Sequence, residues 1–183
     1  MDRFFNGDTS NDVETDEYFY IGEGTEKVED WNKYPAQMGV REFYGGDIAG
    51  VWQKLDYLQD LGVEVIYFNP IFVSPSNHKY DIQDYDYIDP HIGKIVKDEG
   101  ELLKRSEQGN LMCDPEHPNK NASRYICRVT DKENLEASNQ FFADFVEEAH
   151  KRGMKVILDG VFNHCGSFNK WLDRECIYED APG

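Results

Sequence analysis

The segment MKVILDGVFNHC, residues 154–165, determines the fold prediction because its character changes halfway along. Its first half, MKVIL, is a short apolar run of the kind that forms a buried strand. Its second half, DGVFNH, places Asp159, Asn163 and His164 where that strand ends. A carboxylate and an imidazole at this spacing can act as acid–base partners, metal ligands or hydrogen-bonding groups for a substrate. The alternative is an aspartate that caps the next loop beside a structural histidine.

A second short strand is predicted upstream, and each of the two strands follows a helix. Residues 63–68, VEVIYF, are apolar and rich in β-formers, and Pro70 stops the run. In DIAGVWQKLDYLQDLG, residues 47–62, apolar side chains recur every three or four positions, which predicts a helix that Asp47 caps and Gly62 ends. The same spacing in LEASNQFFADFVEEAHKRG, residues 135–153, predicts a second helix that ends at Gly153.

The order helix, strand, long loop, helix, strand predicts a parallel βαβ unit. Both strands look apolar on both faces, as parallel strands covered by helices do. Polar residues gather only at their carboxyl ends, with Asn69 after the first strand and Asp159 and His164 after the second. In βα-barrels and doubly wound sheets, ligands bind at this end of the strands. We therefore expect a ligand site there.

The remaining stretches show weaker patterns. Residues 1–46 are polar without a clear period, which predicts a loop with little regular structure, typical of a functional loop or of a missing neighbour. Residues 94–133 are mixed in charge and rich in turn formers. The cluster CDPEHPNKNAS within them argues against a regular element, so we interpret this stretch as an insertion.

Composition narrows the classes of partner and location. The 183 residues suffice for one domain, and the formal net charge of −17 argues against a nucleic-acid partner. There is no run of 18 or more apolar residues, so no membrane span is expected. The four cysteines form no CxxC pair, and the N-terminus lacks the pattern of a signal peptide. These features predict a reducing cytoplasm, with secretion as the alternative.

Two further clusters of polar residues suggest binding sites. In SNHKYD, residues 76–81, Tyr80 can stack on a pyranose ring while neighbouring groups such as Asp81 hold hydroxyls; the alternative is a solvated acidic loop. NGDTSND, residues 6–12, places four oxygen-bearing side chains around a glycine, which suits calcium or a plain polar turn. The later YGGD could complete such a cage from a distance. The oxygen-bearing residues are Asn6, Asp8, Asn11, Asp12 and Asp47.

The long stretches GVEVIYFNPIFVSPSNHKYDIQDYDYIDPHIG, residues 62–93, and GMKVILDGVFNHCG, residues 153–166, resemble the α-amylase superfamily of glycoside hydrolases. Within it, the sequence is most similar to the cyclomaltodextrinase, neopullulanase and maltogenic amylase subgroup. DRFFNGDTSND and FYGGD also resemble that subgroup. The resemblance covers most of the chain apart from roughly residues 13–42 and 94–133.

This resemblance implies an α/β fold, a (β/α)₈ TIM barrel that cleaves α-1,4-glucosidic bonds with retention. Residues 1–183 would then be a fragment of the catalytic barrel with strands 2 and 3 and helices 1 and 2. The first strand would be truncated, residues 94–133 would be inserted between strand 2 and helix 2, and residues 165–183 would begin the excursion after strand 3. The implied substrates are maltooligosaccharides, cyclodextrins, pullulan or starch.

The resemblance also implies roles for individual residues. Tyr80 would stack on the glucose unit on the non-reducing side of the scissile bond, and His164 would hydrogen-bond the same unit. Asp159 would support the catalytic centre, and Asn163 would brace its loop. A structural calcium ion would be held by Asn6, Asp8, Asn11, Asp12, the carbonyl of Gly45, and Asp47.

The bond-breaking residues are not among these. Retaining glycosidases need two carboxyl groups about 5–5.5 Å apart, and in this family the nucleophilic Asp follows strand 4 and the acid/base Glu follows strand 5. The chain ends shortly after strand 3 and shows no GxRxD-like motif. We therefore expect no hydrolase activity from this chain alone.

Two strands of a barrel also leave both sheet edges open, so we expect pairing with the remainder of the barrel, or self-association. Two alternative functions stay open. One is a non-catalytic carbohydrate- or calcium-binding module, and the other is a glucanotransferase of the same superfamily.

Overall fold

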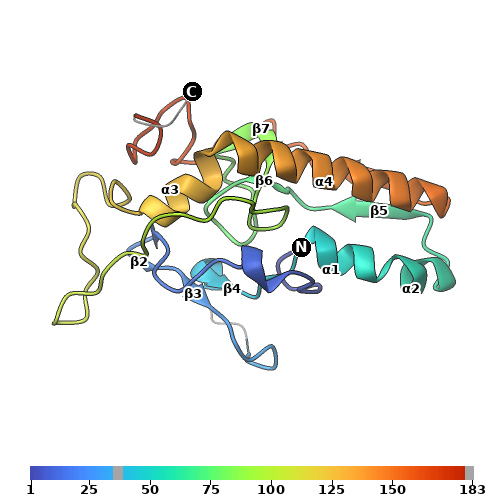
Figure 1. Cartoon of the computed structure of the whole chain (residues 1–183), viewed down its shortest axis with the longest axis horizontal. Coiled ribbons are helices and arrows are strands. Elements are labelled where there is room, and N and C mark those ends of the chain that lie inside the picture. The colour runs from blue at the N-terminus through green and yellow to red at the C-terminus, as the bar shows by residue number, and fades with distance from the viewer. Residues whose placement is uncertain (35–38, 180–183) are drawn as a thin grey trace.

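The computed structural model describes residues 1–34 and 39–179, and a pair of parallel strands lies in the part drawn at the right of Figure 1. Strand β5 (Val65–Phe68) pairs with β8 (Lys155–Leu158), in the register that sets Val65 opposite Lys155 and Phe68 opposite Leu158. The long helix α4 (Lys132–Lys151) connects the two strands as a crossover. The predicted parallel βαβ unit is therefore present.

Helices cover one face of this strand pair. Helices α1 (Ile48–Gln53) and α2 (Leu55–Asp60) run beside α4 along the strands (Figure 1). The aromatic ring of Trp52 stacks on Phe141 of α4 at 5.4 Å between centroids. The buried cluster beneath the helices contains Ile48, Val51, Leu55, Phe68, Ile71, Ile88, Ile92, Phe145, Ala149 and Met154.

The other face of the strand pair is open. The side chains of Val65, Tyr67 and Ile157 are 42%, 56% and 47% exposed. The expectation of strands buried on both faces is therefore wrong, because within residues 1–34 and 39–179 helices lie against one side of this sheet of two strands. The described residues therefore form an α/β layer of helices on a two-stranded parallel sheet, and they do not close into a barrel.

Capping explains where the helices begin. The carboxylate of Asp47 accepts a hydrogen bond from the Gly50 amide at 2.6 Å, and Gly62 leaves the helical region with a φ of +82°. The predicted single helix over residues 47–62 is interrupted at Lys54, whose φ of −105° and ψ of 4° divide it into α1 and α2. Helix α4 begins earlier than expected because Asp131 caps it by accepting from the Glu133 amide.

Short elements make up the N-terminal segment, as the prediction of little regular structure requires. The 3-10 turns span Thr9–Asn11 and Gly39–Arg41. Strands β1 (Phe19–Tyr20) and β2 (Glu23–Gly24) pair antiparallel. Strands β3 (Glu26–Lys27) and β4 (Glu42–Phe43) pair parallel.

After β5, the chain forms an irregular hairpin. Strand β6 (Phe72–Val73) pairs antiparallel with β7 (Asp84–Ile88), with a register shift between Phe72 and Val73. The loop between these two strands contains the SNHKYD motif. The hairpin therefore carries Tyr80 beyond the carboxyl end of β5.

The stretch 94–133 contains a helix that the sequence analysis did not predict, α3 (Ser123–Thr130). The cluster CDPEHPNKNAS, residues 113–123, is non-helical as far as Ala122, but its last residue, Ser123, begins the helix. Tyr125 and Val129 lie in a second buried cluster, and Arg128 between them is also buried. The charged Arg128 occupies a buried position of this helix and interrupts the apolar spacing. The expectation of no regular element is therefore wrong for residues 123–130.

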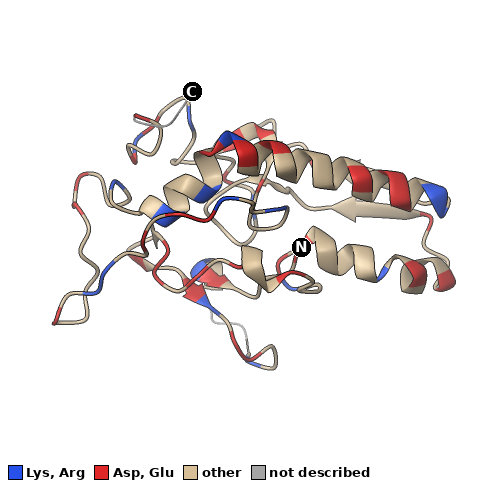
Figure 2. Cartoon of the chain, viewed as in Figure 1, with Lys and Arg blue, Asp and Glu red and all other residues tan. Residues whose placement is uncertain are grey.

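The second cluster joins parts of the chain that are distant in the sequence: the N-terminal segment, strand β6, the stretch 94–133, helix α4 and the segment after β8. Its members are Val13, Tyr18, Tyr20, Phe43, Val73, Leu103, Ala122, Tyr125, Val129, Leu135, Phe168 and Ile177. Acidic side chains are spread over the N-terminal segment and along α4 (Figure 2), in accord with the net charge of −17. Among the described residues, no helix has the length and apolarity needed to cross a membrane.

We expect the packing of α4 on the strand pair to dominate stability. Phe145 is fully buried, and its ring lies 5.6 Å from that of Phe68. Phe145→Ala should lower the free energy of unfolding by about 3–5 kcal/mol, because it removes a large buried ring and leaves a cavity. Phe162→Ala is the matched control, since Phe162 is 95% exposed. Equal losses in the two variants, measured by urea denaturation, would contradict this packing.

Candidate functional site

The carboxyl ends of β5 and β8 bring the two predicted sugar-site motifs together. The Tyr80 hydroxyl donates a hydrogen bond to Asp159 Oδ2 at 2.9 Å, across 79 positions of sequence. The Asp159 amide donates to the Phe68 carbonyl at 3.1 Å and so extends the strand pairing by one residue. The hydrogen bond with Asp159 raises the pKa values of both the Tyr80 and the Tyr67 phenols.

The Tyr80 side chain is set between two anchored neighbours. Lys79 adopts a left-handed φ of +62°, and its ammonium group donates to Asp89 at 2.6 Å and to the Ser74 carbonyl at 2.8 Å. Tyr80 itself is 37% exposed, whereas Lys79 is buried. The loop therefore directs the cation into the protein and the phenol ring outward.

The Asp81 carboxylate is the second anchor. It accepts hydrogen bonds from Ser74 Oγ at 2.7 Å, from Ser76 Oγ, and from the Tyr20 hydroxyl at 2.5 Å. The predicted contact of Asp81 with substrate hydroxyls stays a prediction, because the carboxylate holds these three protein hydroxyls.

His164 and Asn163 lie exposed after β8. The Asn163 amide nitrogen is 3.3 Å from His164 Nδ1, and the His164 backbone carbonyl accepts from the Tyr85 hydroxyl at 2.6 Å. Within residues 1–34 and 39–179, the structure shows no hydrogen bond from the His164 ring to Tyr80 or Asp159. The structure therefore forms the pair of Tyr80 with Asp159, whereas the exposed His164 ring contacts Asn163.

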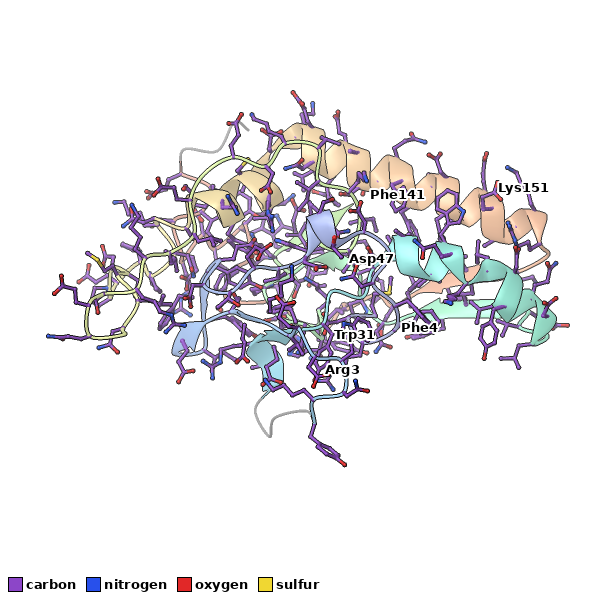
Figure 3. All side chains as sticks on the ribbon, turned by 60° about the horizontal axis from the view of Figure 1, so that its bottom comes forward. Arg3, Phe4, Trp31, Asp47, Phe141 and Lys151 are labelled. Atoms are coloured by element: carbon purple, nitrogen blue, oxygen red, sulfur yellow. The ribbon has the colours of Figure 1, made fainter. Side chains whose placement is uncertain are left out.

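Most of the residues predicted to bind calcium converge where the N-terminal loop meets α1. Figure 3 shows Asp47 at the start of this helix. Asp47 accepts from the amides of Gly7 and Asp8 at 2.9 and 2.8 Å, and Asn11 Nδ2 lies 3.5 Å from it. The Asp8 carboxylate instead accepts from Ser10 and pairs with Lys94 at 2.6 Å.

Gly45 closes this group of residues on the other side. Asn6 Nδ2 donates to Asp12 Oδ1 at 2.7 Å. A Cβ atom added to Gly45 would lie 2.3 Å from Asp12 Oδ1 and 2.5 Å from Asn6 Nδ2, and its φ is +75°. Only glycine allows the backbone to approach these side chains so closely.

Unpaired oxygens in this region fit a hard cation. The side-chain oxygens of Asn6 and Asn11 are buried and have no hydrogen-bond partner. Burial raises the pKa values of Asp12 and Asp47, although their hydrogen bonds oppose it. Among the described residues, no group of three or more His, Cys, Asp and Glu side chains could hold a metal. A calcium ion would therefore depend on the two asparagine oxygens and backbone carbonyls as well as carboxylates.

The structure also contains a buried chain of ion pairs that the sequence analysis missed. His91 Nε2 lies 2.7 Å from Glu17 Oε1, and its Nδ1 lies 2.9 Å from Asp89 Oδ1. Burial alone would lower the pKa of His91, but the two carboxylates outweigh it and raise the pKa. The pKa of Asp89 is lowered despite burial, because Lys79 and His91 face it. The segment IDPHIG gave no signal of this arrangement.

A cavity of about 900 Å³ lies between the N-terminal strands and the loop near residue 109. It is lined by ion-paired groups, such as Arg41 with Glu23, and Arg105 at its rim pairs with Asp16. None of the predicted site residues lines this cavity. We therefore do not assign it as the sugar site, although it is large.

Comparisons with known proteins identify the family of the chain. The sequence matches the family described as "Alpha amylase, catalytic domain" over residues 1–113 and 137–182. The chain belongs to this family of glycoside hydrolases, as the resemblance of its motifs predicted.

Among curated relatives, neopullulanase 2 of Thermoactinomyces vulgaris is 37% identical over 165 residues, which cover 90% of this chain and 18% of that protein. An amylopullulanase of Thermoanaerobacterium saccharolyticum is 33% identical, over 98% of this chain and 12% of its own length. The chain thus spans less than a fifth of these two relatives.

A solved structure supports the fold assignment. The type III pullulan hydrolase of Thermococcus kodakarensis superposes with a TM-score of 0.63 at 31% identity, over 93% of this chain and 23% of that chain. The βαβ unit with its open face is therefore part of a TIM barrel of the α-amylase type.

The buried histidine predicts a pH-dependent stability. Glu17 and Asp89 face the ring nitrogens, Tyr125 stacks against the ring, and Arg128 and Lys79 pair with the same two carboxylates. Because the pKa of His91 is raised above 6.5, its ion pairs stabilise fully below this pH, and the stabilisation is lost as the pH rises through the folded-state pKa.

The measurement is the free energy of unfolding from urea curves between about pH 6 and 9. Wild type should lose stability across this window, and the His91→Gln variant should lose less. Parallel curves for the two proteins would contradict the assignment.

Proposed function

We propose that this chain forms the substrate-contacting part of an α-glucan hydrolase, with β5 and β8 as strands 2 and 3 of the barrel. The observation that carries the proposal is the Tyr80–Asp159 hydrogen bond of 2.9 Å at the carboxyl ends of these strands. Ligands of parallel barrels bind at this end. Relatives named neopullulanase, cyclomaltodextrinase and amylopullulanase support maltooligosaccharides, cyclodextrins, pullulan or starch as the substrate class.

Each side chain has a role that its geometry allows. The exposed ring of Tyr80 presents a flat apolar surface on which a glucose ring can stack. Its hydroxyl, held by Asp159, fixes the tilt of that ring. His164, exposed beside Asn163, can donate to a sugar hydroxyl. These contacts orient one glucose unit but supply neither a nucleophile nor an acid/base pair.

Cleavage therefore requires residues outside this chain, and the proposed partner is the remainder of the barrel. An apolar cavity of about 320 Å³ runs along β5 and is lined by Met1, Phe4, Val65 and Tyr67, among others. Together with the open face of the β5–β8 pair, this cavity offers a surface that further strands could cover. The alternative is that a second copy of the chain covers this surface by self-association.

We also propose a structural calcium ion at the junction of the N-terminal loop with α1. The supporting observation is the pair of buried, unpartnered oxygens on Asn6 and Asn11 next to Asp12 and Asp47. The Gly45 carbonyl would complete the set, because the Gly45 backbone lies against Asp12. The ion would fix the N-terminal loop onto α1.

A binding experiment tests the proposed function. The 183-residue chain should bind maltoheptaose in calorimetry but release no reducing sugar from β-cyclodextrin, pullulan or soluble starch. Tyr80→Ala should weaken binding by about 0.5–1.5 kcal/mol through the lost stacking surface, whereas Tyr80→Phe should retain most of the affinity. Tyr34→Ala is the matched control, because Tyr34 is 92% exposed and lies on another loop.

Three other outcomes are informative. Hydrolysis that Asp159→Asn abolishes would show that carboxylates of this chain break bonds and would overturn the assigned roles. Absence of any glucan binding would overturn the proposal itself. Binding that persists in the whole protein without any cleavage would favour a non-catalytic carbohydrate-binding module.

The calcium site predicts a metal-dependent stability. Excess calcium at about 100 times the dissociation constant should raise the free energy of unfolding by about 2.7 kcal/mol, and magnesium should act less because it demands tighter geometry. Asn11→Ala should remove most of this effect, whereas Asn32→Ala on an exposed loop should leave it intact. Thermal unfolding with calcium, magnesium or chelator is the measurement. A calcium response equal in both variants would exclude this site.

A further inference from the structure

A continuous chain of buried charges runs from helix α3 to the loop that carries Tyr80. Arg128 Nη1 donates to Glu17 Oε2 at 2.8 Å, and Glu17 Oε1 lies 2.7 Å from His91 Nε2. His91 Nδ1 lies 2.9 Å from Asp89 Oδ1, and Asp89 Oδ2 accepts from Lys79 Nζ at 2.6 Å. The five side chains are each at most 4% exposed. Every link is therefore shielded from water.

Positive and negative charges alternate along these five side chains. Both ring nitrogens of His91 face carboxylate oxygens, so both must donate and the ring carries a positive charge. The sequence of charges from Arg128 to Lys79 is then positive, negative, positive, negative, positive. Loss of one member leaves a neighbouring buried charge with too few partners, and such a charge draws in water or changes its position.

The last member of this chain is the residue before Tyr80. The left-handed backbone of Lys79, at a φ of +62°, turns its ammonium group inward while the next side chain points outward. Such a conformation is costly for a lysine and persists only where its surroundings hold it. The Lys79–Asp89 pair supplies that restraint. The orientation of the Tyr80 ring therefore depends on where Asp89 is held.

The first member lies outside the family match. The match covers residues 1–113 and 137–182, which include Glu17, Lys79, Asp89 and His91 but not Arg128. Arg128 also donates to the Asp12 carbonyl at 2.8 Å and forms a two-pronged pair with Asp98 at 2.8 and 2.9 Å. Helix α3 thus inserts one cation beneath a network whose other four members lie in the matched region.

We propose that Arg128 is a positioning residue for Tyr80 and that the stretch 114–136 braces the sugar-contacting loop from beneath. The proposal rests on the proposed function in one respect, since it takes Tyr80 to be a glucan contact. Arg128 acts through Glu17, which fixes His91, which in turn fixes Asp89. The stretch 114–136 then sets the affinity of the site without touching the sugar.

The test is a double-mutant cycle on maltoheptaose binding at Arg128 and Tyr80, carried out in the full-length protein. Arg128→Gln should weaken maltoheptaose binding by roughly 3- to 10-fold, the range of a lost aromatic contact. In a Tyr80→Ala background the same substitution should have no further effect. Arg124→Gln is the matched control: it lies one turn earlier on α3, and its nearest carboxylate is Asp98 at 3.9 Å. It should bind like wild type.

Two further variants separate positioning from general destabilisation. Phe145→Leu weakens the other buried cluster and should leave the affinity unchanged in protein that is fully folded by circular dichroism. Arg128→Lys keeps one cationic donor and should restore part of the affinity. If Arg128→Gln and Tyr80→Ala add independently, or if Phe145→Leu weakens binding as much, the positioning role is overturned.

A readout without ligand keeps this test independent of the proposed function. The ring signals of Tyr80 in NMR spectra, assigned by comparison with Tyr80→Phe, should shift in Arg128→Gln and stay in place in Arg124→Gln. Unchanged Tyr80 signals in Arg128→Gln would overturn the inference, whether or not glucan binds. Shifted signals in a protein that binds no α-glucan would support the brace and refute only the proposed function.

Discussion

The parallel pairing of β5 with β8 is the constraint on which the rest of the structure depends. Its register sets Phe68 opposite Leu158, so the carboxyl ends of both strands lie at the same end of the sheet. The residues that follow, Asn69 and Asp159, therefore leave the sheet side by side. The hairpin after β5 folds back over this edge, which allows Tyr80 to reach Asp159. An antiparallel pair would have placed these two chain ends at opposite edges.

Two different kinds of interaction then hold the site. Apolar packing of α1, α2 and α4 fixes the strands, and this packing is not directional. The loop that carries Tyr80 is instead held by an ion pair and by hydrogen bonds. Lys79 pairs with Asp89, and Asp81 accepts from Ser74, and both contacts are directional. Directional bonds define the ring orientation more sharply than packing does, which suits a contact that must match a sugar ring.

Periodic and motif signals predicted the parts of the fold that depend on local sequence. The cap at Asp47, both strands and the parallel βαβ order followed from the spacing of residues. The resemblance predicted that Tyr80 and His164 contact one glucose unit, but the hydrogen bond of Tyr80 to Asp159 was not predicted. Helix α3 and the charge chain did not follow. Glu17 and Arg128 are 111 positions apart, and an arginine inside a helix looks like a solvated residue until its partner is known. Pairing over such a distance leaves no trace in a local pattern.

In the proposed function, the open face of the sheet separates the substrate contacts of this chain from catalysis. Asp159 lies at an edge where Tyr67 and Ile157 are about half exposed, so water reaches the Tyr80–Asp159 pair. Electrostatic stabilisation of a charged transition state is strong only where water is excluded. Orientation of a sugar by ring stacking needs no such exclusion, because it depends on contact area. Under the proposed function, the two strands therefore suffice to hold a glucose unit in place, whereas breaking its bond requires the two catalytic carboxyl groups and a covered face.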